Sequence, residues 1–416
     1  MRTAIRIATV ALLALGCNVR YSSSSSSNPQ PVTDPNAGKP VETAEPAGKP
    51  IDKPDPEAEK QAKAKAEYDA AIKEADAAAA KEAERWTPEL RASTAKLTAR
   101  KWSSTKQALT AALASPHRVP GNAARDNDRH PVKTMEFFGL KPTMTVFEVG
   151  PGGGWWTELL AVVLAAKGKL VLASFDPKSD DLRTAYYAHS IELLLGKSTE
   201  LFGKVETVKS PGPGTYDLGP ADSLDMVLMM RASHNLAGSG NLDKLLAAAH
   251  TSLKPGGILA IEQHRAADGA DPKQSAEKGY LPEKWVIEQV EAAGFKLEKK
   301  SEINANAKDT KDYPQGVWTL PPSFAEGDKD KAKYEAVGES DRMTLKFVKP
   351  RTRGGKPAAP AGPGLTPTRT PTAPTAETPA ADTGKMVAPK KAADAPAGKT
   401  ATTTVGTETG TGKAVK

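Results

Sequence analysis

The chain has 416 residues, a length that would allow two or three domains, but its composition argues against a chain that is packed throughout. Only 38% of the residues are hydrophobic and 5% are aromatic, and the formal net charge is +7. Residues 18–56 and 351–416 hold eight and nine of the 34 prolines and almost no aromatic residues. Such segments cannot bury enough apolar surface to offset the entropy of ordering. One domain of ordinary size therefore remains, over residues 115–350.

The positive charge is concentrated at the C-terminal end. Residues 351–416 carry ten Lys/Arg and four Asp/Glu and so supply +6 of the net +7. A basic patch interleaved with aromatic residues would favour a nucleic-acid partner, and this segment has no aromatic residue. We therefore expect a disordered tail and no specific nucleic-acid binding. The single cysteine excludes an internal disulfide framework, and no metal-ligand spacing is present, so no metal site is expected.

The first 17 residues have the pattern of an export signal. Arg2 and Arg6 precede an apolar stretch at residues 7–15, which is too short to span a membrane and is typical of a secretory signal peptide. The run Leu-Ala-Leu-Gly-Cys at residues 13–17 resembles a bacterial lipobox, in which cleavage leaves Cys17 to receive lipid. The alternative is a plain signal peptide followed by an incidental cysteine.

The lipobox resemblance implies an exported lipoprotein, anchored in the cell envelope by lipidation of Cys17. Asn18 is not the aspartate that retains such proteins at the inner membrane, which favours the outer membrane facing the periplasm. Residues 18–54 are rich in Ser and Pro and are expected to form a disordered tether. Residues 55–114 are rich in Ala, Lys and Glu, with helix-start signals at residues 55–57 and 87–89. Because no sustained apolar seam is present, a solvated helical spacer is favoured over a coiled coil, although the second helix has leucines that could pack on the domain.

From residue 141 onward, strand and helix patterns alternate. Strands are predicted at residues 145–149, 170–174, 205–208, 225–230, 258–262, 295–301 and 343–348. Helices are predicted at residues 155–166, 181–195, 242–253 and 283–293. This alternation predicts an α/β, Rossmann-like fold with a mostly parallel seven-stranded sheet and helices on both faces. Ligands of such sheets bind at the carboxyl ends of the strands.

A glycine-rich turn follows the first of these strands, in the run VFEVGPGGGWWT at residues 146–157. The dinucleotide fingerprint G-x-G-x-x-G fails here, because its third glycine would fall on Trp155 or Thr157. An NAD-type oxidoreductase is therefore the weaker alternative. The pattern acid-x-G-x-G-x-G is complete in Glu148, Gly150, Gly152 and Gly154.

This loop resembles motif I of class I S-adenosylmethionine-dependent methyltransferases. The resemblance implies that the four residues hold the cofactor S-adenosyl-L-methionine, and that Asp176, after the second strand, binds its ribose hydroxyls. Residues 115–350 also resemble a group of bacterial predicted methyltransferases, through Asp-Arg-x-Pro at 128–131 and the run at 139–154. Further matching positions are 231–234, 264–265, 340–342 and 346–350. Ala232 departs from the Asn of that group.

Three residues are candidates for the chemistry. His234, just past the fourth strand, and His264, at the end of the fifth, are candidates for the base that takes a proton from the acceptor. Arg231 is a candidate for binding an anionic group of the substrate. For each histidine a purely structural role is the alternative, and for Arg231 a solvent-exposed salt bridge.

The leading interpretation is S-adenosylmethionine-dependent methyl transfer to an unidentified acceptor, either a small molecule or an envelope component. Export is in conflict with a cofactor that is made in the cytosol. The alternative is therefore a catalytically silent, methyltransferase-like binding domain anchored in the envelope. The insert at residues 302–339 is polar and unpatterned, so it does not identify the acceptor.

Overall fold

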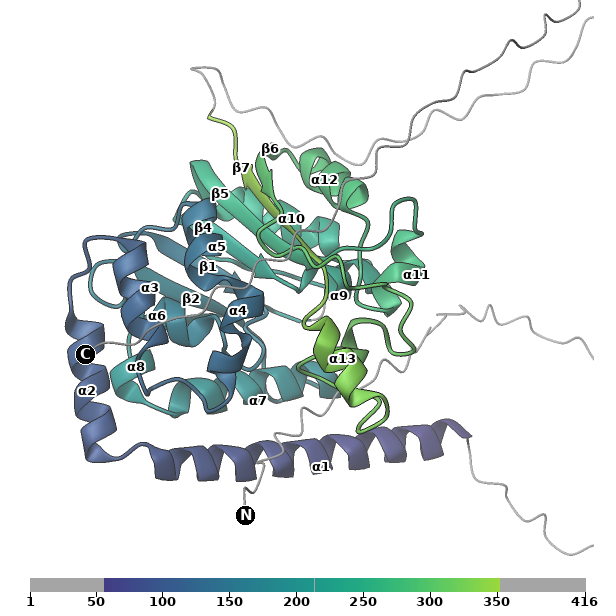
Figure 1. The fold of residues 1–416 in the computed structure, drawn as a ribbon, viewed down its shortest axis with the longest axis horizontal. Coiled ribbons are helices and arrows are strands. Elements are labelled where there is room, and N and C mark those ends of the chain that lie inside the picture. Colours follow the sequence, from purple (N-terminus) through teal and green to yellow (C-terminus); the bar gives the residue numbers. More distant parts are fainter. Residues whose placement is uncertain (1–55, 213, 352–416) are drawn as a thin grey trace, which may run out of the picture. The chain divides into compact units, whose positions relative to one another are not determined.

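Seven strands form one sheet in the order β3-β2-β1-β4-β5-β7-β6 (Figure 1). The structure is a computed structural model that describes residues 56–212 and 214–351. The strands are β1 (Thr145–Val149), β2 (Lys169–Ser174), β3 (Glu206–Lys209), β4 (Leu224–Met230), β5 (Leu253–His264), β6 (Lys296–Ser301) and β7 (Arg342–Val348). Neighbours among β1 to β5 pair in parallel, and β7 is antiparallel to both β5 and β6. The predicted fold class, a Rossmann-like α/β fold with a mostly parallel seven-stranded sheet, is confirmed.

Helices cover both faces of this sheet. Those before β2 are α1 (Pro56–Arg85), α2 (Pro88–Ala99), α3 (Thr105–Leu113), the 3-10 turn η1 (Asn122–Arg125), α4 (Asp126–Arg129), α5 (Pro131–Phe138) and α6 (Thr157–Leu164). Those after β2 are α7 (Leu182–Gly196), α8 (Thr199–Phe202), α9 (Ser233–Gly238), α10 (Leu242–Ser252), α11 (Pro272–Glu277), α12 (Glu283–Ala292), the 3-10 turn η2 (Gly316–Thr319) and α13 (Lys331–Val337).

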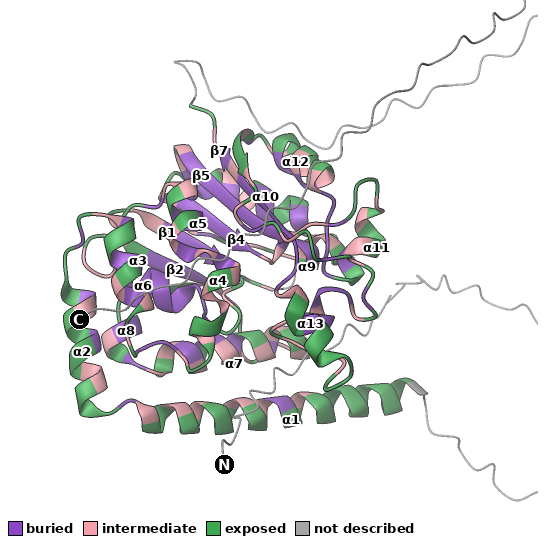
Figure 2. Cartoon of the chain, in the orientation of Figure 1, coloured by how far each residue is buried: buried purple, intermediate pink, exposed green. Residues whose placement is uncertain are grey.

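The alternation of side chains along each strand builds two cores. In β1, Val146 belongs to a cluster that includes side chains of α3, α5, α6 and α8, whereas Phe147 belongs to a cluster that includes α10 and α12. Successive residues of a strand point to opposite faces, so each central strand contributes to both clusters. Burying a large apolar side chain of this kind contributes about 1.5–3 kcal/mol. Figure 2 shows the central strands buried between the helical layers. The sheet edge is thereby held rigidly enough to position a site.

The segment before residue 115 divides into an exposed part and a packed part. Trp86, Trp102 and Leu109 are buried in the cluster that contains α6. Most of α1 is exposed, with Ala71 buried where the helix lies along α7 (Figure 2). Within residues 56–212 and 214–351, no helix is both long enough and apolar enough to cross a membrane. The predicted signal peptide, Cys17, the tether and the tail lie outside the described residues.

The insert between β6 and β7 has a small core of its own, although the sequence there shows no periodic pattern. Tyr313, Leu320 and Tyr334 are buried together. At the end of β5, Arg265 forms ion pairs with Glu302 and Asp341, at the two ends of the insert, and with Glu283 of α12. The insert is therefore held in place by aromatic residues that meet through turns and by a long-range ion-pair network, and neither gives a periodic sequence pattern. The insert is thus fastened to the carboxyl edge of the sheet.

Candidate active site

The carboxyl ends of β1 and β4 mark the point where the strand order reverses. β1 pairs in parallel with β2 on one side and with β4 on the other, with Val149 opposite Met229. In open α/β sheets the crevice outside such a switch point is the usual ligand site. The residues that follow these strands, Gly150, Asp176 and Arg231, therefore lie on one edge of the sheet. This edge carries every predicted site residue that falls within the described chain.

The glycine loop, residues 150–154, leaves β1 in a conformation that suits glycine. Gly150, Gly152 and Gly154 have φ values of 66°, 57° and 81°. A Cβ at Gly154 would lie 2.4 Å from the side chain of Leu194, so a larger residue would have to displace that leucine. At Gly152 and Gly153, by contrast, a Cβ would meet nothing within 4 Å. The backbone of these two residues is open on the side where a ligand can approach closely.

Glu148 is a buried acid at the end of β1 and makes no ion pair to offset its burial. Its side chain is 2% exposed and accepts a 2.8 Å hydrogen bond from Oγ1 of Thr157, at the start of α6. Burial raises the pKa of Glu148 to about 7, against the opposing effect of the Thr157 hydrogen bond. A buried carboxyl that shares no cation is destabilising when ionised. Its position beneath the glycine loop indicates a role other than stability.

Asp176 lies two residues past the end of β2, the strand next to β1, and its side chain is exposed. Its Oδ1 accepts a 2.9 Å hydrogen bond from the backbone N–H of Lys178. This bond fixes the carboxylate in the turn that follows the strand. An exposed carboxylate held beside an open glycine loop is suited to accept hydrogen bonds from a pair of hydroxyl groups.

A second segment, residues 118–129, packs against the helix that follows the glycine loop; we call it the cover segment. Glu158 of α6 holds it by accepting hydrogen bonds from Arg118, the backbone N–H of Val119 and Asn122. The indole N–H of Trp155 donates a 3.0 Å hydrogen bond to the carbonyl of Asn122. The cover segment is therefore held against the start of α6, directly after the glycine loop. From the sequence alone, Arg125, Asp128 and Arg129 fit either a lid over the cofactor or a charged surface loop.

His234, in α9, is buried and neutral. Burial lowers its pKa to about 4. Its Nδ1 lies 3.3 Å from Oε1 of Gln263, whose Nε2 donates hydrogen bonds to the carbonyls of His264 and Gly279. Because the amide nitrogen of Gln263 donates to these two carbonyls, the amide oxygen of Gln263 faces His234 and accepts a hydrogen bond from its Nδ1–H. Nε2 is then the unprotonated nitrogen. The site thus contains a neutral imidazole with a defined tautomer.

The structure brings His264 beside His234, with ring centroids 5.6 Å apart. Burial, followed by the influence of His234 and Arg231, holds the pKa of His264 well below its usual range. Its Nδ1 is hydrogen bonded to the hydroxyl of Ser340. Trp318, from the insert, lies edge-on to His234 at 5.8 Å. The two histidines are therefore partners in one aromatic wall to which the insert contributes.

Arg231 follows β4 directly and has a left-handed φ of 57°, which is a strained conformation for a residue with a side chain. Its Nη1 lies 3.2 Å from Oε2 of Glu339, with 3% of the Glu339 side chain exposed. The alternative for Arg231 was a solvent-exposed salt bridge. Arg231 does form a salt bridge, but its partner Glu339 is buried, so that alternative is wrong. The next residue is Ala232, and a Cβ added at Gly150 would lie 3.4 Å from the Cβ of Ala232. The turn after β4 therefore lies against the glycine loop.

Glu339 is the residue that sequence reasoning missed. It lies at the centre of the arginine cluster, formed by Arg125, Arg129, Arg231 and Arg342, all of which are ion paired to it. Burial alone would raise its pKa, but the four guanidinium groups hold the pKa of this carboxyl well below its usual range. In the sequence, Glu339 ends a polar insert in which it is one acid among several. Only the fold reveals that three distant arginines converge on it, together with Arg342, which is three positions away.

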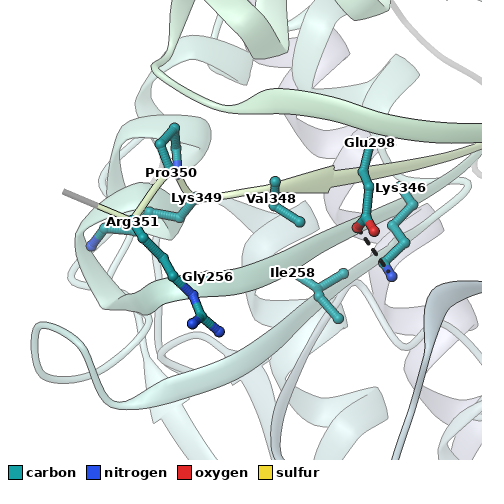
Figure 3. Close-up of a pocket in the computed structure, with 8 residues that line it drawn as sticks. All are labelled: Gly256, Ile258, Glu298, Lys346, Val348, Lys349, Pro350 and Arg351. Atoms are coloured by element: carbon teal, nitrogen blue, oxygen red, sulfur yellow. Dashed lines mark ion pairs between the residues drawn. The ribbon is translucent and has the colours of Figure 1, made fainter. Parts of the chain in front are cut away.

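The described residues do not contain a group of three or more His, Cys, Asp or Glu side chains arranged to hold a metal ion. A cavity of about 440 Å³ lies elsewhere, beside Gly256 and Ile258 near the start of β5 and Val348 and Arg351 at the end of β7 (Figure 3). These residues occupy the amino edge of β5, opposite to the edge that carries the glycine loop. The cavity is therefore separate from the candidate active site.

Comparison with known proteins gives matches in structure alone. Neither a family model nor a curated protein matches the sequence. The structure of an S-adenosylmethionine-dependent methyltransferase from Aquifex aeolicus is similar, with 21% sequence identity and a TM-score of 0.36. The match covers 60% of this chain and 100% of that one. The N-methyltransferase NodS from Bradyrhizobium japonicum is 12% identical, with a TM-score of 0.35, over 56% of this chain and 99% of that one.

A phosphoethanolamine N-methyltransferase from Haemonchus contortus, solved with S-adenosylhomocysteine, is 15% identical with a TM-score of 0.37. The match covers 58% of this chain and 61% of that one. These similar structures are methyltransferases, and the likeness is a distant one of fold. What this chain binds has to be judged from its own residues.

Proposed function

We propose that this protein catalyses S-adenosylmethionine-dependent methyl transfer to an acceptor that binds at the carboxyl edge of β4 and β5. The observation that carries the proposal is the glycine loop, which is open above Gly152 and Gly153 at the point where strand order reverses. The exposed carboxylate of Asp176 on the neighbouring strand fits a ribose diol beside it. Glu148, buried without a cation beneath the loop, is the kind of residue that is retained for function.

When bound, the cofactor supplies an electrophilic methyl group on a sulfonium. The protein's part is then to align the acceptor and to accept its proton. Nε2 of His234 is an unprotonated nitrogen in this wall, and we assign it the role of proton acceptor. A pKa of about 4 makes His234 a weak base that is fully neutral near pH 7. It therefore suits an acceptor whose proton becomes acidic only as the new bond to carbon forms.

Two glycine variants test the cofactor site. Gly152 and Gly240 both have positive φ values, 57° and 66°, and a Cβ would meet nothing within 4 Å at either position. Gly152→Ala and Gly240→Ala should therefore cost similar stability, about 1–2 kcal/mol. Calorimetric titration of the full chain with S-adenosylmethionine should show at least tenfold weaker binding for Gly152→Ala alone. No heat from the unmodified protein at millimolar cofactor would sink the proposal.

A binding domain without turnover is the second candidate. It is favoured by Ala232, where the resembled group has Asn, and by the lowered pKa of both His234 and His264. The two candidates share the cofactor site and differ in chemistry. Cofactor binding together with no labelled product from radioactive S-adenosylmethionine in any envelope or small-molecule extract would support this candidate.

For the location we propose export and lipid anchoring in the envelope, based on the sequence of residues 1–17. Metabolic labelling with a radioactive fatty acid should mark the chain, and Cys17→Ser should abolish the label. Export without any label would leave a plain signal peptide in place of the anchor.

A further inference from the structure

The arginine cluster has more positive charge than its buried carboxylates balance. Arg125, Arg129 and Arg231 have Glu339 as their ion-pair partner, at 3.1, 2.8 and 3.2 Å. The remaining arginine, Arg342, divides its guanidinium between Glu339 and Glu262. Asp128 is a third acid beside the cluster, and its carboxylate accepts a hydrogen bond from the backbone N–H of Glu339. Three carboxylates, those of Asp128, Glu262 and Glu339, therefore face four guanidinium groups.

One guanidinium nitrogen of the cluster is buried without a partner. Arg129 is 1% exposed, and its Nη1 has no hydrogen-bond acceptor among the described residues. The indole of Trp155 lies 4.7 Å from its Cζ, and this cation–π contact is weaker than a buried hydrogen-bonded charge pair. A buried N–H that is charged and unpaired is destabilising, so folded proteins rarely keep one without a use.

The cluster borders the glycine loop, where Arg129 contacts Trp155 and Ala232 lies against Gly150, but it lies on the β4 side of the loop, away from Asp176. Gly152 and Asp176 follow β1 and β2, whereas Arg231 follows β4 and Arg342 begins β7 opposite His264. Arg231 is also three residues from His234, the nitrogen base assigned above. An acceptor must reach the side of the cofactor on which the base lies, and the cluster borders that side. Its charge is therefore available to the acceptor rather than to the ribose.

We propose that the arginine cluster binds an anionic group, a carboxylate or phosphate, of the methyl acceptor, with Nη1 of Arg129 and the guanidinium groups of Arg125 and Arg231 as the donors. This assignment rests on the proposed methyl transfer. It narrows the acceptor to acidic molecules and makes the three arginines specificity residues. Planar guanidinium forks bind such groups with two parallel hydrogen bonds, which also fixes the acceptor's orientation.

Inorganic phosphate is the probe for this site, used on the full chain without cofactor at an ionic strength kept constant with chloride. Phosphate should raise the melting temperature along a saturable curve and change the fluorescence of Trp155, which stacks on Arg129. Arg129→Gln and Arg125→Gln should each weaken the apparent phosphate affinity at least tenfold. Arg125 is partly exposed, so its variant remains informative if Arg129→Gln does not fold.

Arg265→Gln is the matched control, because that guanidinium lies on the same edge but is saturated by Glu283, Glu302 and Asp341. It should keep the phosphate effect. An equal, non-saturable effect in all variants would overturn the anion site.

Saturating S-adenosylhomocysteine separates the acceptor from the cofactor's own carboxylate. Phosphate should still bind in its presence. Loss of phosphate binding with S-adenosylhomocysteine, but not with 5′-methylthioadenosine, which lacks the amino-acid part, would assign the cluster to the cofactor and overturn the proposal. Failure of S-adenosylhomocysteine to bind at all would overturn the proposed function and the acceptor assignment. It would leave the phosphate result itself intact, so the two failures are distinguishable.

Discussion

Two halves of the candidate site are built in opposite ways. The half that we propose binds the cofactor (the cofactor half), Glu148 with the glycine loop and Asp176, is made largely by neighbours in sequence: Glu148 and its partner Thr157 are nine positions apart. The half that we propose binds the acceptor (the acceptor half), Arg231, His234 and His264 with the arginine cluster, depends mostly on contacts between distant positions. Arg231 and Arg129 are 108 and 210 positions from Glu339. A local sequence motif can predict the cofactor half, whereas the contacts of the acceptor half form only when the chain has folded.

The largest effect is expected where the long-range contacts meet. Glu339→Gln should lower the free energy of unfolding by about 3–5 kcal/mol, because four guanidinium groups would lose a buried charge partner. Glu298→Gln, which breaks an ion pair with Lys346 in which Glu298 is partly exposed, should cost less than about 1 kcal/mol. Urea unfolding of both variants provides the measurement. Equal small losses would mean that the acceptor half is not held together by Glu339.

The cofactor half should respond with the opposite sign. The pKa of Glu148 is raised to about 7 in the folded chain, so its burial costs little at pH 5 and about 3 kcal/mol at pH 8, where it is ionised in both states. Glu148→Gln should therefore stabilise the protein by up to about 3 kcal/mol at pH 8 and by under about 1 kcal/mol at pH 5. The same variant should weaken S-adenosylmethionine binding.

Glu158→Gln is the matched change on α6, since that acid is also buried but holds Arg118, Val119 and Asn122. It should destabilise the protein by about 1–3 kcal/mol. A Glu148→Gln protein that is less stable at pH 8 would contradict the reading of Glu148 as an unpaired acid kept for function.

The smallest effect concerns His117, which precedes the cover segment and whose Nε2 lies 3.1 Å from the carbonyl of Glu158. Burial lowers its pKa to about 4, so the unfolded chain binds more protons between about pH 6.5 and pH 4. Stability is then lost as pH falls through this window. Between pH 7 and pH 5 the free energy of unfolding should fall by about 2 kcal/mol less in His117→Gln than in the unmodified protein, as measured by urea unfolding. An unchanged pH dependence would show that the histidine is solvated.

The sequence was sufficient for the seven strands and for the conformation of the glycine loop, and the reason is physical. Strand and helix periodicity is local, and the predicted strand at residues 145–149 coincides with β1. Positive φ at Gly150 and Gly152 is likewise a property of the residue type. The sequence also nominated Arg231, His234 and His264, and the structure brings these three together, although the role of each is still a prediction.

What the sequence could not supply was the partner of each charge. Glu339 and Glu262 are buried acids whose neighbours come from other strands and from the cover segment. No spacing in one chain identifies such a set, because ion pairs have no period. The insert was hidden for the same reason: Tyr313, Leu320 and Tyr334 meet through turns rather than along one helix face.

The position of β7 sets a limit on when this protein can fold. Among the described residues β7 is the last strand in sequence, yet it lies between β5 and β6 and is hydrogen bonded to both. Until residue 348 is available, β6 has no strand to pair with, and Glu339 and Arg342 are missing from their cluster. The sheet therefore cannot be completed until β7 has been synthesised. A chain arrested before β7 should remain sensitive to proteases, and one extended past it should not.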